Sequence, residues 1–205
     1  MPHDASAPAT PTGNSYDKYR AEHSLERRLV EGFLRALDSV LPAAKPDRVL
    51  EVGAGEGEIS GRLRARYPGA TVVSIDLHDP SLGEEWRRRG ALGTFADVRQ
   101  LPFPDRSFDL VLGIEVLEHV VSPGVALTEI ERVSRGAVVL SVPREPIWRI
   151  ANVLRGRYVR QGGNTPGHLN HWSTRRFRAL VANRFDVQAT NTPFPWTILS
   201  ARRRA

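Results

Sequence analysis

The sequence predicts a doubly wound α/β fold with a mostly parallel sheet, because short apolar runs alternate with amphipathic stretches along its 205 residues. A long amphipathic helix over 24–41 is expected first, and a shorter helix over 174–183 comes late in the chain. Five strands are expected in between, with a helix in each of their four intervals, and two further strands close the chain. The expected strands cover 48–53, 71–76, 91–96, 108–113, 136–142, 185–190 and 196–201.

The most informative stretch is 48–57, Arg-Val-Leu-Glu-Val-Gly-Ala-Gly-Glu-Gly. Its apolar part reads as a buried parallel strand. Gly53, Gly55 and Gly57 then form a turn without side chains, so that backbone can approach a ligand closely. The next helix starts at Glu58 and directs its first amides toward the same place. Asp76 ends the following strand, where a carboxylate can accept both hydroxyls of a ribose. The stretch predicts a site for a nucleoside-like ligand.

The glycine spacing argues against a dinucleotide. The dinucleotide pattern Gly-x-Gly-x-x-Gly would place its third glycine at position 58, which is Glu58. Glu56 and Glu58 would also repel a pyrophosphate at the start of the helix. A ligand with a positive centre fits these acids better.

Together with later motifs, the chain resembles the class I S-adenosylmethionine-dependent methyltransferases, and within them the type 11-like family. The later motifs are Phe-Ala-Asp-Val at 95–98, Leu-Pro-Phe-Pro-Asp at 101–105 and the run 107–120, which ends in Val-Leu-Glu-His-Val. The resemblance covers about 16–200. It implies a Rossmann-like methyltransferase fold, a seven-stranded sheet whose last strand is antiparallel, with S-adenosyl-L-methionine as the cofactor.

The resemblance also assigns cofactor contacts residue by residue. It implies that Glu51 binds the ammonium of the methionine part through water, that Asp97 accepts the adenine amino group and that Val98 contacts the ring by its backbone. The carboxyl end of the strand at 113–115 is expected beside the methionine part. The full set of expected cofactor residues is Tyr19, Glu51, Gly53, Gly55, Asp76, Leu77, Asp97, Val98, Ile114 and Glu115.

We expect acceptor chemistry in an insertion at about 143–172, which follows the fifth strand and therefore lies over the active-site edge as a lid or substrate wall. His168 and His171 are its candidate catalytic residues, as a base or an acceptor ligand, although methyl transfer can proceed by positioning alone. His119 is interpreted as structural. No metal is expected, because no carboxylate lies near His168 and His171 in sequence.

The composition of the chain indicates its domain organisation and the class of protein to which it belongs. Residues 1–14 read as a disordered tail rather than a secretory signal, and 15–205 as a single methyltransferase domain. No apolar run reaches the length of a membrane span. Zero cysteine is typical of a cytoplasmic enzyme, and the preference for arginine over lysine of a bacterial one.

Charge is uneven, because residues 136–205 hold 12 arginines and only two acids, Glu145 and Asp186. This excess, with an amphipathic stretch at 144–160, favours a small-molecule or lipid-type acceptor and peripheral membrane contact. Nucleic acid is disfavoured as a partner because no RNA-binding module is evident. The oligomeric state is left open.

The predicted function is therefore methyl transfer to an O, N or C atom of such an acceptor. The alternatives are an RNA or protein acceptor, and a non-catalytic relative that only binds the cofactor. An NAD-dependent oxidoreductase fits least, since Glu58 stands where that pattern needs glycine.

Overall fold

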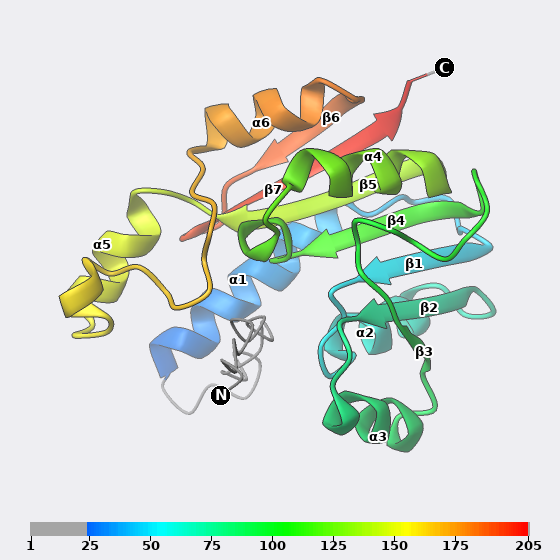
Figure 1. Ribbon diagram of the computed structural model, residues 1–205, viewed down its shortest axis with the longest axis horizontal. Coiled ribbons are helices and arrows are strands. Elements are labelled where there is room, and N and C mark those ends of the chain that lie inside the picture. Colours follow the sequence, from blue (N-terminus) through cyan, green and yellow to red (C-terminus); the bar gives the residue numbers. More distant parts are fainter. Residues whose placement is uncertain (1–23, 205) are drawn as a thin grey trace, which may run out of the picture.

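The computed structural model describes residues 24–204, which form one seven-stranded sheet with helices on both faces (Figure 1). The strand order is β3-β2-β1-β4-β5-β7-β6. The strands are β1 (Arg48–Val52), β2 (Thr71–Asp76), β3 (Leu92–Phe95), β4 (Phe108–Ile114), β5 (Ser134–Pro143), β6 (Phe185–Asn191) and β7 (Trp196–Arg203). The helices are α1 (Ser24–Val40), α2 (Glu58–Arg66), α3 (Pro80–Arg88), α4 (Pro123–Val133), α5 (Ile147–Leu154) and α6 (Thr174–Ala182), with short 3-10 turns η2 (Leu117–His119) and η3 (Val159–Gln161).

The predicted fold class is confirmed. Strands β1 to β5 pair in parallel, whereas β7 runs antiparallel to both β5 and β6. The order reverses at β1, because β2 lies on one side of it and β4 on the other. In open sheets of this kind, ligands bind outside the carboxyl ends of the strands at such a switch point.

Two apolar layers hold the sheet between helices. Alternate residues of β1 point to opposite faces, so Leu50 packs with α4 and α6, while Val49 packs with α1 and α2. Both layers contain side chains that are fully buried. Burial on both faces explains why the central strands read as continuous apolar runs. It also places Glu51, on the same side as Val49, under α2.

One expected helix is absent. The chain between β3 and β4 is a loop, not the helix predicted for that interval. Pro102 and Pro104 cannot donate backbone hydrogen bonds, which disfavours a helix there. Arg132 of α4 holds the loop instead, because its guanidinium donates to the carbonyls of Leu101 (2.8 Å) and Phe103 (2.7 Å).

The insertion after β5 comprises α5, η3 and the loop to α6, and it lies beyond the carboxyl ends of the parallel strands, on the left in Figure 1. Its helix α5 is short, and none of the helices described here has the length and apolarity that a membrane crossing requires. The predicted tail at 1–14 falls outside the described residues.

Candidate functional site

A cavity of about 520 Å³ opens at the carboxyl ends of β1, β2 and β4. It brings together every predicted cofactor residue that the structure describes, from elements far apart in sequence; Tyr19 lies outside the described residues. The predicted residues on its wall are Glu51, Gly53, Gly55, Asp76, Leu77, Asp97, Val98, Ile114, Glu115 and His168.

The glycine turn after β1 is held from two sides. Asp76 accepts the Gly55 N–H through one carboxylate oxygen and the Leu77 N–H through the other, both at 2.7 Å. Trp86 of α3 donates its indole N–H to the Gly55 carbonyl at 2.8 Å. Gly53 has a φ of 68°, and a Cβ there would stand 2.3 Å from a Val116 methyl. Only glycine therefore fits position 53 without moving the turn.

Glu51 is a buried acid below this turn. The residue as a whole is 2% exposed. Its carboxylate accepts a hydrogen bond from Ser60 of α2, which also contacts Ser74 of β2. Burial raises the pKa of Glu51 to about 8, and the hydrogen bond from Ser60 only partly opposes this. A cation placed beside Glu51 would favour its charged form.

The acids at the start of α2 are partly neutralised. Arg89 forms an ion pair with Glu58 at 2.7 Å and lies 3.9 Å from Glu56. The repulsion between these two acids and a pyrophosphate is therefore smaller than the sequence alone indicates. Exposed pairs of this kind contribute little stability.

Asp97 follows β3 at the far side of the cavity. Arg99 forks onto its carboxylate, with the closest contact at 2.6 Å, and this hydrogen bond lowers the pKa of Asp97. Asp97 is therefore held as a carboxylate, an acceptor suited to an amino group. The pairing with Arg99 was not predicted from the sequence.

Glu115 follows β4 in a left-handed conformation, with a φ of 59°. Such a conformation is strained for a residue other than glycine, and contacts to β5 and β7 hold it here. The carboxylate accepts from the Trp196 indole (2.7 Å) and from the Ser141 hydroxyl (3.1 Å), and the backbone N–H donates to the Ser141 carbonyl (3.2 Å). The side chain thereby ties β4 to β5 and β7 at the cavity.

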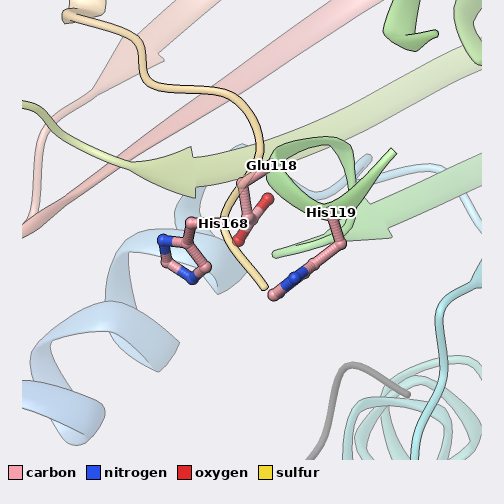
Figure 2. Close-up of side chains that lie close together, drawn as sticks. All are labelled: Glu118, His119 and His168. Carbon is pink, nitrogen blue, oxygen red and sulfur yellow. The ribbon is translucent and has the colours of Figure 1, made fainter. Parts of the chain in front are cut away.

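The two predicted catalytic histidines are placed differently. His168 is buried on the cavity wall, with Trp148 stacked on it at 6.0 Å between ring centroids and His119 edge-on at 4.9 Å. His171 is exposed, contacts Asn164 and does not line the cavity. Figure 2 shows the carboxylate of Glu118 between the imidazoles of His119 and His168.

The insertion supplies cavity residues that were not among the predicted site residues. Trp148 and Asn152 of α5 both line the cavity and both donate to the Thr165 hydroxyl. Arg157 reaches back to Glu26 of α1 at 3.1 Å. These contacts hold α5 and the loop at 163–168 over the cavity.

Part of the sequence matches a known family of domains. Residues 50–140 match the family model described as "Methyltransferase domain", which spans β1 to the middle of β5 and includes the glycine turn, Asp76 and Asp97. Over residues 50–140 the chain is therefore similar to the methyltransferase domain family.

Two curated proteins each align with this chain over 134 residues. One is the malonyl-[acyl-carrier protein] O-methyltransferase of Halorhodospira halophila, 34% identical over 62% of this chain and 44% of that protein. Another is the demethylmenaquinone methyltransferase of Thermus thermophilus, 36% identical over 62% of this chain and 60% of that protein. The chain thus spans about half the length of the curated relatives it matches.

A solved structure supports the fold. The chain aligns with magnesium protoporphyrin IX methyltransferase from Synechocystis PCC 6803, determined with bound SAH, at a TM-score of 0.67. The alignment covers 91% of each chain at 19% sequence identity. At that identity the likeness concerns the fold alone.

Asp76→Asn should weaken S-adenosylmethionine binding by on the order of 2 kcal/mol, because a neutral amide replaces the charged acceptor beside the ribose position. Isothermal titration calorimetry measures the change. The matched control is Asp105→Asn, an exposed acid bonded to Arg132 and away from the cavity. Equal affinity of wild type and Asp76→Asn would refute the ribose assignment.

Glu51→Gln should remove a pH dependence of stability. Burial raises the pKa of Glu51 from its ordinary value of 4.5 to about 8, so the folded protein binds one more proton than the unfolded chain between about pH 4.5 and 8. Its unfolding free energy therefore falls as pH rises through this window, by at most about 1.4 kcal/mol per pH unit from this group. Chemical denaturation at about pH 5.5 and about pH 8 measures this slope. An unchanged slope in Glu51→Gln would contradict the burial of an acid here.

Proposed function

We propose that this protein transfers the methyl group of S-adenosylmethionine to an O, N or C atom of a small-molecule or lipid-type acceptor. The observation that carries the proposal is the convergence of the predicted cofactor residues on one cavity, next to an aromatic wall contributed by the insertion. Methyl transfer is an in-line attack on a sulfonium, so a site that positions two molecules performs most of the task.

We propose a single orientation for the cofactor in the cavity. Asp76 would take the ribose hydroxyls, since its carboxylate oxygens each keep acceptor capacity after binding one backbone N–H. Glu51 and the backbone at Glu115 would face the methionine part, and Asp97 with Val98 would face the adenine. The sulfonium then lies near the carboxyl end of β4, toward the insertion.

The acceptor side is aromatic. Trp148 and Trp196 lie 5.8 Å apart between ring centroids, and both line the cavity beside His168. Flat aromatic walls beside polar side chains suit an acceptor with an apolar body and a polar reactive atom. Of the two catalytic candidates we propose His168 as the residue that contacts the acceptor. Such acceptors are consistent with the names of two relatives, malonyl-[acyl-carrier protein] O-methyltransferase and demethylmenaquinone methyltransferase.

The function test is transfer of labelled methyl from S-adenosylmethionine to a panel of a malonyl thioester, a medium-chain fatty acid and a short-tailed naphthoquinol, with bulk RNA and protein as separate arms. Trp148→Ala should lower kcat/KM for the accepted compound about tenfold or more, from loss of a stacked wall. The affinity of the Trp148→Ala variant for S-adenosylmethionine should stay within about twofold of the wild-type affinity. Leu154→Ala, a truncation at an 82% exposed position of the same helix, is the control.

Label confined to RNA or protein would favour those acceptors and overturn the lipid-type assignment. Cofactor binding with no labelled product in any arm would favour the non-catalytic relative. We place the reaction in the cytoplasm, where the absence of cysteine is ordinary.

We also propose that the insertion touches an anionic membrane surface. Ile150, Val153, Leu154 and Val159 are 40–82% exposed on one segment, and the exposed Arg160 follows them. Apolar side chains rimmed by arginine are typical of interfacial helices. Arg157 contributes less to this charge, since it pairs with Glu26.

Co-sedimentation with anionic and zwitterionic vesicles tests this contact. Leu154→Glu should reduce binding to anionic vesicles about tenfold, because it removes an inserted apolar group and adds a repelled charge. Leu92→Glu, at a 60% exposed position on the edge strand β3, should bind like wild type. Absence of wild-type binding to anionic vesicles would refute the contact.

A further inference from the structure

The side chains of Glu118, His119 and His168 form a compact cluster on the cavity wall. One potential ligand atom from each lies within 4.8 Å of the others. Glu118 and His119 come from η2, directly after β4, and His168 comes from the insertion. Figure 2 shows the three side chains converging from these two segments.

We propose that this cluster binds a divalent first-row transition-metal ion. Two imidazoles and one carboxylate are a ligand set that such ions accept, and catalytic zinc sites use it with a further position open. Ligand atoms about 2.1 Å from a tetrahedral ion lie roughly 3.4 Å apart, so the observed spacing needs side-chain movements of about 1 Å to close on an ion.

The surroundings of His119 support a ligand role. Its Nδ1 lies 2.9 Å from the carbonyl of Gly167, and a carbonyl can only accept, so Nδ1 carries the proton. The lone pair of the neutral ring is then on Nε2. Histidines that bind metals are commonly oriented in this way, with the second ring nitrogen donating to a backbone carbonyl.

The backbone around the cluster is fixed as well. The Glu118 carbonyl accepts the N–H groups of Leu169 (2.7 Å) and Asn170 (3.0 Å), and the Asn170 amide donates to the carbonyls of Leu117 and Val120. Trp148 stacks on His168 from the other side. Ligands held by secondary contacts of this kind are preorganised for an ion.

The position of the cluster in the cavity assigns a catalytic role to the ion, and this role rests on the proposed function. All three side chains line the same cavity as the cofactor residues. An acceptor hydroxyl coordinated there would release its proton to water, and its oxygen would form the new bond to the methyl carbon as the sulfur–carbon bond breaks. The cofactor would leave as a neutral thioether.

Cobalt and zinc test the site on the tag-free, chelator-treated protein without cofactor. The chain has no cysteine, so visible Co²⁺ absorption would come from nitrogen and oxygen ligands. We expect one equivalent of Co²⁺ to bind, Zn²⁺ to displace it, and the melting temperature to rise. His119→Ala, His168→Ala and Glu118→Gln should each weaken binding about tenfold or more.

His171→Ala is the matched control, since His171 lies in the same loop but outside the cluster. Retention of wild-type affinity in His119→Ala and His168→Ala, or no saturable binding of either ion, would overturn the proposal. Should those variants not fold by circular dichroism, paramagnetic shifts of the His119 and His168 ring signals in Co²⁺-loaded wild type decide the matter, and their absence counts against the site.

The same preparation separates the two proposals. Binding of S-adenosylmethionine without binding of metal would leave the methyltransferase assignment standing and refute the ion alone. Binding of metal without binding of S-adenosylmethionine would leave the ion site standing and refute the methyltransferase assignment.

Discussion

The carboxylate of Asp76 joins the two strands that border the predicted cofactor site. It accepts one N–H from the turn after β1 and another from the end of β2, each at 2.7 Å. The glycine turn is therefore held at a fixed height above the sheet, and Gly53 and Gly55 line the cavity without side chains that would fill it. Burial raises the pKa of Asp76 above its usual value, and the two backbone donors only partly oppose this.

A second constraint couples the acceptor wall to this frame. The loop that carries His168 is fastened to η2 through the carbonyl of Glu118 and the amide of Asn170. Because η2 comes two residues after β4, this fastening sets the insertion beside the strand end where the methionine part is predicted to lie. Trp196, which donates to Glu115, adds β7 to the same assembly. Cofactor and acceptor sides thus share one set of rigid elements, as positioning of two reactants requires.

Much of this arrangement could be predicted because it is local in sequence. The glycine turn and Asp76 follow their strands immediately, and alternation of apolar runs indicates a sheet covered on both faces. The helix predicted between β3 and β4 was wrong, because a guanidinium from α4 stabilises a proline-containing loop there. That contact joins residues some thirty positions apart and leaves no local pattern.

The approach of His168 to Glu118 is equally invisible in sequence. The hydrogen bond that brings their segments together joins positions some fifty apart, and it depends on the path of the insertion. The arginine-rich final third has a similar explanation. Arg184 pairs with Glu131 of α4, and Arg203 donates to the Glu131 carbonyl, so part of that charge is used within the fold. Composition alone could not assign those arginines to internal partners.

The most direct test is parallel calorimetric titration of the protein with S-adenosylmethionine, S-adenosylhomocysteine and NAD. Saturable micromolar binding of the two sulfur nucleosides, with no heat from NAD, is the result that this account predicts. Binding of NAD alone would contradict it, because the glycine turn and Asp76 would then serve a dinucleotide.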